Sequence, residues 1–450
     1  MTNGVPALPR DLGDGLTLRF ARREDARALA AFNARIHSGD FSGDRPEPDE
    51  GVRAWTLDLF RGDHPTTGPG DFTVVVDRKA KDRIVSSLCT VSQTWTYAGI
   101  PFGVGRPELV GTDPEYRQRG LVAHQFEVIH AVSQSRGELV QGITGIPWYY
   151  RQFGYEMALS LDANRRMYWH RVPELKAGEK EAFRLRPATL EDISVLDRMY
   201  RVFTGRNLVS RPRTEALWRY EMTGPGEKSH YAHKFQMIET LAGDPVGYVD
   251  YKPLEWNRML WVRELSLLPE CPAYSIATFL CRRLQSEAER LNRKREKPLR
   301  GIQFNLGSEH PVYTALDGRL EKMKQPYAWY LRVPDLPVFL RHIGPELEAR
   351  LKGSAMAGYA GALKLNCYTS QYRLEFDEGQ LTAVEPYRAQ RFFDGDAFFP
   401  GLTFLQLLFG YRSLEELRHA FSDCFAEEEK YALLLDILFP KRPSEVIALG

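Results

Sequence analysis

The stretch "LVGTDPEYRQRGLVAHQF", residues 109–126, changes from a strand-like pattern to a helical one. Val110 and its neighbours precede a turn at Pro114, and apolar residues recur at helical spacing from Leu121. The first N–H groups of a helix have no partner inside it, and they lie at the positive end of the helix dipole. The sequence Arg-x-x-Gly at residues 117–120 therefore predicts an anion-binding site that suits a phosphate pair.

Two features of this turn favour that prediction. Gly120 lets a phosphate approach the backbone because it has no Cβ. Arg117 and Arg119 add positive charge, or one of them holds the loop. No Lys-Ser/Thr pair follows, so the turn differs from the loop that binds nucleoside triphosphates and magnesium. The alternative interpretation is a charged turn before an ordinary helix.

Composition limits the function classes. The 450 residues predict about two to four domains. With 60 basic and 59 acidic residues the net charge is +1, so no overall attraction to nucleic acid or membranes is expected. Residues 1–15 do not resemble a signal peptide, and no apolar run approaches the roughly 18 residues of a membrane span. Five scattered cysteines and ten histidines without ligand spacing favour a reduced, cytoplasmic protein without a metal site.

The chain repeats the pattern L-R-x-A-x-x-E-D-x-x-x-L without a gap, at residues 18–29 and 185–196. Each copy predicts a strand end followed by a helix with acidic residues in its first turn. Candidate strands follow the first copy at 71–77, 83–97, 108–113 and 138–144, and the second at 235–240, 245–254, 259–268 and 301–306. In each set a helical pattern precedes the last strand. This order predicts a mixed α/β domain that occurs twice.

Two boundaries divide the chain. Residues 171–182 are polar and predict a linker, and Pro334 and Pro337 mark a second boundary. Residues 362–384 alternate apolar and polar side chains, which predicts an antiparallel meander, and helices are expected at 400–410 and 413–421. We therefore expect three domains, and we place them at 1–170, 171–335 and 336–450.

A second motif lies at "GITGIPWYYRQFGYEMA", residues 142–158, where three tyrosines surround Phe153 and Gly154. Clustered aromatic side chains usually form core, and we interpret Tyr155 in that way. For Tyr150 a chemical role is the alternative, since a phenol can donate a proton to a leaving group.

Together these motifs resemble the GNAT acetyltransferases, which carry V-x-V-x-P-x-x-R-x-x-G-x-G/A here and a tyrosine four residues before the glycine of Y-x-x-x-G-F/Y. Thr112 and Val122 depart from that pattern. The resemblance implies acetyl-CoA as acetyl donor, no metal, and direct transfer to a primary amine, with Tyr150 as proton donor. It implies that the thioester arm pairs along the strand and that the pyrophosphate lies over the turn. The implied coenzyme contacts are Val110, Gly111, Thr112, Arg117, Gln118, Arg119, Gly120, Leu121, Val122 and Ala123.

The whole layout resembles the enhanced-intracellular-survival (Eis) acetyltransferases, through "RQRGLV", "YYRQFGY" and the tail "LFPKRPSEVIALG". This resemblance implies an α/β (α+β) fold: tandem GNAT folds, each a mixed central sheet flanked by helices, plus a C-terminal sterol-carrier-protein-like α+β domain. It also implies a homo-hexamer. In that family the carboxylate of the last residue is the general base, which here is Gly450, where an aromatic residue is frequent. Glu108, on the strand beside the thioester, is the reserve candidate.

We expect one cofactor site per chain. Glu264-Leu265 aligns with Glu108-Leu109, but no Arg-x-x-Gly follows it. Pro272 would also remove an N–H group from the second helix's N-terminus.

The acceptor is an amine of a class that the sequence does not fix. An acidic segment follows the first helix, and an acidic rim would attract a cationic lysine, polyamine or aminoglycoside; a solvated loop is the equal alternative. Its acidic residues are Asp40, Asp44, Glu47, Asp49 and Glu50. We expect Phe41 and Trp55 to line the acceptor pocket, and for Trp55 the alternative is packing in the core. The basic stretch 290–300 is interpreted as a solvated helix end rather than a nucleic-acid contact. The rival function is a lipid- or hydrophobe-binding carrier that uses the C-terminal domain.

Overall fold

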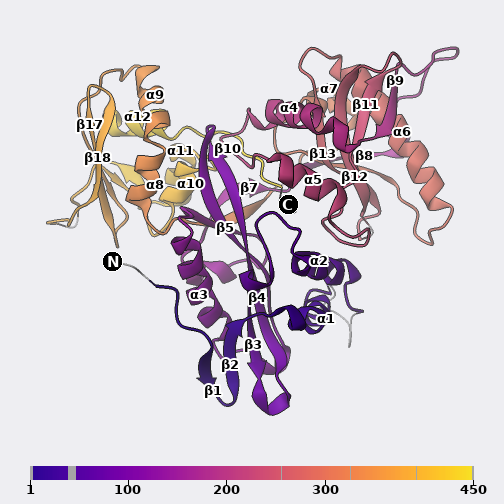
Figure 1. Ribbon diagram of the computed structural model, residues 1–450. Helices are drawn as coiled ribbons and strands as arrows, with labels where there is room; N and C mark the ends of the chain where they lie inside the picture. The colour runs from indigo at the N-terminus through magenta and orange to yellow at the C-terminus, as the bar shows by residue number, and fades with distance from the viewer. Residues whose placement is uncertain (1–3, 39–46, 255, 325, 392, 448–450) are drawn as a thin grey trace.

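The computed structural model describes residues 4–38, 47–254, 256–324, 326–391 and 393–447. Its strands form three sheets, each with its own helices (Figure 1). The mixed α/β architecture predicted from the sequence is thereby confirmed.

The first sheet has the strand order β1-β2-β3-β4-β5-β6-β15-β7, and β10 pairs with β4. Its strands are β1 (Arg10–Gly13), β2 (Leu16–Phe20), β3 (Phe72–Asp77), β4 (Arg83–Tyr97), β5 (Ile100–Thr112), β6 (Val140–Ile143), β7 (Glu156–Leu161), β10 (Val209–Ser210) and β15 (Tyr327–Arg332). The helix α3 (Leu121–Ser135) covers one face, and α1 (Ala26–Ile36) and α2 (Glu50–Arg61) cover the other (Figure 1).

Alternation along β3 explains this layering. Val75 packs with Leu121 and Val128 of α3, whereas Val74 packs with Leu29 of α1 on the opposite face. Successive side chains of a strand point to opposite faces, so a strand of continuous apolar residues can be covered on both sides.

The second sheet has the order β8-β14-β13-β12-β11-β9. Its strands are β8 (Asn164–Tyr168), β9 (Phe183–Pro187), β11 (Gln236–Thr240), β12 (Pro245–Leu254), β13 (Met259–Leu267) and β14 (Gly301–Asn305), with the helices α4 (Ile193–Thr204), α5 (Glu215–Thr223), α6 (Ala273–Asn292) and α7 (Pro311–Ala315). The strands and helix predicted at 235–306 are confirmed in order and in position.

The third sheet has the order β18-β17-β16-β19-β20. Its strands are β16 (Gly361–Asn366), β17 (Gln371–Asp377), β18 (Gln380–Pro386), β19 (Ala397–Phe398) and β20 (Phe425–Ala426), with the helices α8 (Leu336–His342), α9 (Gly344–Lys352), α10 (Phe404–Leu408), α11 (Leu414–Ala420) and α12 (Glu429–Leu438). The predicted meander is confirmed as β16–β18. The helix expected at 400–410 is shorter, because Gly401 adopts a positive φ of 59°.

Two strands are exchanged between the first two sheets. β15 lies between β6 and β7 of the first sheet, and β8 pairs with β14 of the second. The sequence did not predict these strands or α2. The ranges 1–170, 171–335 and 336–450 remain our proposal for the domains, with β8 and β15 exchanged across the first boundary.

The sequence repeat corresponds to the same local structure in both copies. In the first, Arg19 donates two hydrogen bonds, of 2.7 and 2.8 Å, to Asp25. In the second, Arg186 donates two of the same lengths to Asp192. Each aspartate also accepts from the backbone N–H three residues earlier, at 2.7 Å. The pair therefore joins the end of a strand to the start of the following helix.

Replacing Asp192 with Asn tests this junction. The hydrogen bond from Arg186 is the main cause that lowers the pKa of Asp192 from 3.8 to about 2, against burial. A lowered pKa stabilises the fold above the unfolded value, and that contribution disappears as the pH falls through the folded value. We expect Asp192→Asn to reduce the free energy of unfolding by about 1–2 kcal/mol at neutral pH, measured by urea denaturation.

The difference should shrink as the pH falls from about 4 toward 2. Glu191→Gln, which removes an exposed charge from the same turn, is the control. Equal stability of both variants at neutral pH would show that the pair holds nothing together.

Candidate functional site

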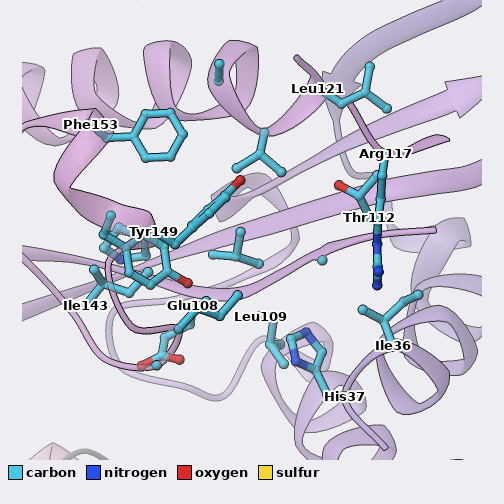
Figure 2. Close-up of a pocket in the computed structure, with 18 of the residues that line it drawn as sticks. Ile36, His37, Glu108, Leu109, Thr112, Arg117, Leu121, Ile143, Tyr149 and Phe153 are labelled. Atoms are coloured by element: carbon cyan, nitrogen blue, oxygen red, sulfur yellow. The ribbon is translucent and has the colours of Figure 1, made fainter. Parts of the chain in front are cut away.

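A cavity of about 1040 Å³ opens between β5, the N-terminus of α3 and the 3₁₀ helix η5 (Tyr149–Phe153), with α1 and α2 on its other side (Figure 2). The ten residues named as coenzyme contacts all line it: Val110, Gly111, Thr112, Arg117, Gln118, Arg119, Gly120, Leu121, Val122 and Ala123. Tyr150 and Glu108 line the same cavity. The structure thus brings these sequence candidates together in one place.

The cavity exists because two neighbouring strands separate. β5 pairs in parallel with β6 only at Val104 and Gly105, although β5 continues to Thr112. The register of β4 against β5 shifts near Cys89, and Leu109 adopts a positive φ of 52°. A bulge of this kind bends a strand and increases its twist. Beyond Gly105, none of the described strands pairs with the edge of β5 that faces β6.

The N-terminus of α3 lies at the open end of this gap. Gly120 is its N-cap residue, with a φ of 72°, and no side chain in the described part of the chain caps the helix. The first turn contains no acidic residue, and the first intrahelical bond runs from the N–H of His124 to the carbonyl of Gly120. The preceding N–H groups are therefore left for an external acceptor, and the helix dipole favours an anion there. The predicted start of the helix at Leu121 is confirmed.

The two arginines of the turn lie differently. Both are exposed, but the Arg119 guanidinium lies 5.0 Å from the ring centre of Tyr116. Arg117 extends beside Thr112 toward Ile36 (Figure 2). Arg117 is thus the one whose charge reaches along the cavity.

The turn itself is held by Asp113. Its carboxylate accepts hydrogen bonds from Arg35, at 2.9 Å, and from Arg83, at 3.0 Å. Since these partners lie on α1 and β4, the turn is fixed to both.

Sequence reasoning missed the residue that fixes α3 to the sheet. Gln125 is fully buried, donates to the carbonyl of Thr73 at 3.0 Å and accepts from the hydroxyl of Ser86 at 2.6 Å. Ser86 is also within 3.0 Å of the carbonyl of Gly111 on β5. The available signal was a lone amide side chain within the apolar face of the helix, since a buried polar group is normally hydrogen-bonded.

Tyr150 lies on η5 and is 3% exposed. Burial raises its pKa, and the nearby carboxylate of Glu108 adds to the effect. Its phenol is therefore protonated at neutral pH, the form that donates a proton. Tyr155 is fully buried and bonds to His130 at 2.9 Å, which confirms its interpretation as core.

Glu108 faces the cavity and forms an ion pair with the buried Arg106. Burial raises its pKa, although Arg106 opposes the shift. The Arg106 guanidinium also lies 4.8 Å from the ring centre of Trp329 on β15. The exchanged strand thus contacts the acidic end of the cavity.

The unit of the second sheet packs against α2, which forms one wall of the cavity, and the sequence did not reveal this contact. Trp55 of α2 lines the cavity and stacks on Tyr231, with ring centres 4.2 Å apart. Asp49 caps α2 and accepts from His230 at 2.8 Å. Asp49 therefore serves a structural contact. Asp40, Phe41 and Asp44 lie outside the described residues, whereas Glu47 and Glu50 are exposed.

The C-terminal tail runs toward the same end. The N–H of Leu208 donates to the carbonyl of Pro443 at 2.8 Å, and the indole of Trp329 donates to the carbonyl of Val446 at 3.1 Å. Val446 is buried. Gly450, the candidate base, lies outside the described residues.

In the second sheet, β13 and β14 also separate, as β5 and β6 do in the first, but side chains fill the gap between them. β13 and β14 pair only from Leu260 to Val262. Beyond that, His310 bonds to the carbonyl of Leu265 at 3.0 Å, and Tyr313 donates to the carbonyl of Phe304 at 2.8 Å. Side chains of the protein thus hydrogen-bond to backbone carbonyl groups in this gap.

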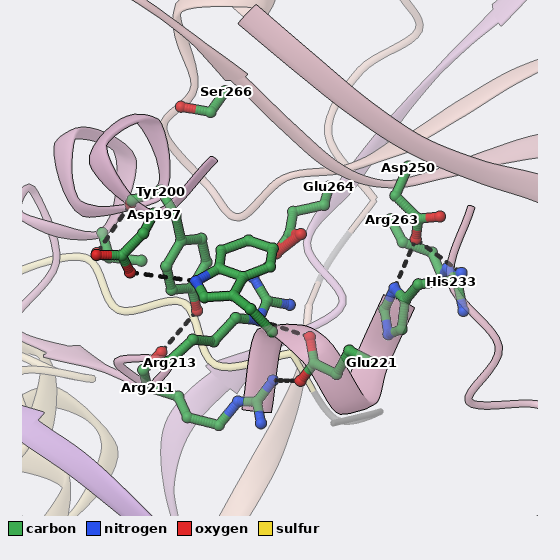
Figure 3. A network of polar contacts seen from close by, with 12 residues as sticks. Asp197, Tyr200, Arg211, Arg213, Glu221, His233, Asp250, Arg263, Glu264 and Ser266 are labelled. Carbon is green, nitrogen blue, oxygen red and sulfur yellow. Dashed lines mark hydrogen bonds and ion pairs between the residues drawn. The ribbon is translucent and has the colours of Figure 1, made fainter. Parts of the chain in front are cut away.

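Buried ion pairs fill the neighbouring interior of the second unit (Figure 3). Glu264, which aligns with Glu108, pairs with Arg213 at 2.6 Å, and both side chains are inaccessible to solvent. Arg213 also pairs with Glu221 at 2.7 Å. Glu264 is therefore paired inside the core, whereas Glu108 faces a cavity.

Residues 46–158 match the family model described as "Acetyltransferase (GNAT) domain". This part of the chain therefore resembles a GNAT acetyltransferase domain, and apart from Ile36 and His37 the residues that line the cavity lie within the matched range. In the described part of the chain no helix is long and apolar enough to cross a membrane. Among the same residues, no three His, Cys, Asp or Glu side chains are grouped closely enough to hold a metal ion.

Solved structures share the fold over almost the whole chain. A GCN5-related N-acetyltransferase from Anabaena variabilis ATCC 29413 is 14% identical, with a TM-score of 0.64 over 96% of this chain and 99% of that chain. One from Kribbella flavida is 17% identical, with a TM-score of 0.62 over 96% and 97%. Eis1 from Mycobacterium abscessus is 14% identical, with a TM-score of 0.57 over 95% and 98%. The sequence matches no curated protein.

Proposed function

We propose that this protein transfers an acetyl group from acetyl-CoA to a primary amine without a covalent enzyme intermediate. One observation carries the proposal: the uncapped N-terminus of α3 and the unpartnered edge of β5 border a single cavity that also contains Tyr150 and Glu108. An anion site, a strand edge and acid–base groups are what a thioester coenzyme with a pyrophosphate requires.

The coenzyme would occupy the cavity from its open end inward. The pyrophosphate would accept from the backbone N–H groups of residues 118–123, with Arg117 supplying charge. The pantetheine arm would extend along Val110, Gly111 and Thr112 and hydrogen-bond to the free strand edge. A Cβ built on Gly120 would project into open space, with no atom within 4 Å. Because glycine has no Cβ, that space is left for the phosphates.

The chemistry would follow from the groups at the inner end. The amine attacks the thioester carbon, a tetrahedral oxyanion forms, and the carbon–sulfur bond breaks. Tyr150 donates its proton to the departing sulfur and regains one from the nitrogen that has become positively charged. The general base is the carboxylate of Gly450 or that of Glu108.

The acceptor would be an amine of the lysine, polyamine or aminoglycoside type. A panel of amines with thiol release as readout identifies the acceptor and the number of amines modified. A sterol-carrier-like third domain, a hexameric assembly and a cytoplasmic location complete the proposal. The carrier alternative is less favoured because the large cavity lies in the GNAT domain.

Charge reversal at the turn tests coenzyme binding. The double variant Arg117→Glu, Arg119→Glu should weaken acetyl-CoA binding at least about tenfold, because two cations beside a pyrophosphate become anions. Isothermal titration calorimetry measures the effect. Arg293→Glu with Lys294→Glu, at the exposed end of α6, is the matched control. Binding that is equal in both double variants would place the coenzyme elsewhere.

Replacing Tyr150 with Phe tests the proton donor. The ring and its packing against Tyr330 are kept, and only the hydroxyl is removed. We expect kcat to fall about 100-fold or more while the dissociation constant for acetyl-CoA is unchanged. Tyr149→Phe, on the same turn, is the control. Unchanged turnover in Tyr150→Phe would assign the proton donor to another group.

Extending the chain tests the terminal carboxylate. One glycine added after Gly450 displaces that carboxylate by up to about 3.5 Å and should lower kcat without affecting coenzyme affinity. The same residue added at the N-terminus is the control. Full activity of the extended chain would leave Glu108 as the base, and Glu108→Gln would then be the inactive variant.

A further inference from the structure

The chain reverses direction in a tight turn just before Tyr150. The N–H of Tyr149 donates to the carbonyl of Pro147 at 2.8 Å, and Trp148 between them has a φ of 69° and a ψ of −35°. A hydrogen bond that spans two residues around a residue of positive φ marks the rare and strained form of the γ-turn. A strained backbone conformation thus lies two residues before the proposed proton donor.

The side chain of Trp148 does not account for this conformation. Its indole is 76% exposed, so burial of the ring contributes little, and its contact with the Arg151 guanidinium lies at the surface. A strained backbone persists only where the surrounding structure imposes it, and such residues gather at functional sites. The reason for this turn is therefore found in the contacts that hold its backbone.

Two tyrosines of β15 hold the turn. The hydroxyl of Tyr330 accepts a hydrogen bond from the backbone N–H of Trp148 at 2.6 Å. The hydroxyl of Tyr327 donates to the backbone carbonyl of Gly145, also at 2.6 Å. Each tyrosine lies 182 residues beyond the residue that it binds, on the strand inserted between β6 and β7. The turn is therefore fixed by a distant segment of the chain.

Both contacts lie next to Tyr150. The ring centres of Tyr330 and Tyr150 are 5.6 Å apart, and a Cβ built on Gly145 would lie 3.9 Å from the Tyr150 hydroxyl. Tyr150 belongs to η5, a 3₁₀ helix of five residues, and so short a helix takes its place from contacts outside it. The position of the Tyr150 hydroxyl therefore depends on the backbone that Tyr327 and Tyr330 hold.

Resting on the proposed function, we propose that Tyr330 and Tyr327 are positioning residues, which fix the strained turn so that the Tyr150 hydroxyl points at the departing sulfur. A proton donor must lie within hydrogen-bond reach of the atom that it protonates, and an error of about 1 Å in such a geometry can cost about 100-fold in rate. Neither tyrosine is among the described residues that line the cavity, so both act through Tyr150.

Tyr330→Phe and Tyr327→Phe each remove one hydroxyl and keep the ring. We expect each change to lower kcat about tenfold and to leave the dissociation constant of acetyl-CoA unchanged, because only the aim of the proton donor is altered. Thiol release gives kcat, with the fastest acceptor among lysine, spermidine and kanamycin, and isothermal titration calorimetry gives the coenzyme affinity.

Tyr313→Phe is the matched control. The Tyr313 hydroxyl is also buried against backbone groups, since it donates to the carbonyl of Phe304 at 2.8 Å and accepts from the N–H of Leu306 at 3.2 Å. Because these bonds lie in the second unit, kcat of this variant should equal that of the wild type.

Combining each change with Tyr150→Phe separates positioning from a general loss of structure. If the two hydroxyls act through Tyr150, their removal costs nothing further once the Tyr150 hydroxyl is absent. The double variants should then match Tyr150→Phe within about twofold. A structural effect would instead lower kcat by the same factor in both backgrounds, and that result would overturn the inference. Single variants with wild-type kcat would overturn it too, as would a loss of coenzyme affinity equal to the loss in kcat.

The proposed function fails separately. Wild-type protein that releases no thiol with any of the three amines overturns acetyl transfer, and unchanged turnover in Tyr150→Phe overturns the proton donor; the inference falls with either. A large loss in Tyr150→Phe, combined with full activity in Tyr330→Phe and Tyr327→Phe, overturns the inference alone.

Discussion

The separation of β5 from β6 after Gly105 is the constraint on which the site depends. Main-chain N–H and C=O groups at a strand edge require partners. Here a bulge at Leu109 bends β5 away from the neighbouring strand β6. The same separation leads to the N-terminus of α3, a second row of unpartnered N–H groups. Gln125 and Asp113 hold these two features in register, so the polar backbone lines one cavity.

In the second unit, side chains of the protein itself bond to the backbone groups that the separated strands expose. Its strands also part, but His310 and Tyr313 bond to the exposed carbonyls, and Glu264 is neutralised by Arg213. The unit instead supports the first site, through Tyr231 against Trp55 and His230 against Asp49. The third unit shares a core with the far end of β4 and β5, where the hydroxyl of Tyr97 donates to the carbonyl of Leu408.

Local patterns allowed much of this to be predicted from the sequence. Most strands and helices that follow each repeat were correctly placed, because alternation and helical spacing are local signals. The exception is β5, which begins at Ile100, whereas a strand was predicted only at 108–113. The motif residues of the turn lie together because they are neighbours in sequence. Contacts between distant segments were missed. Nothing near Tyr231 in the sequence indicates that its ring stacks on Trp55. The exchange of β8 and β15 was also invisible, since a strand's sequence does not name its partner.

The position of β15 links the order in which the chain is synthesised to the order in which the first sheet can form. This strand occupies the interior of the first sheet, between β6 and β7, yet it lies about 165 residues beyond the end of β7, at residues 327–332. During synthesis the place between β6 and β7 therefore stays empty until nearly three quarters of the chain has left the ribosome. Pairings of such sequence separation carry a high entropic cost and form late. The domain that holds the cavity is thus among the first to be translated but cannot be completed until the second unit has been made.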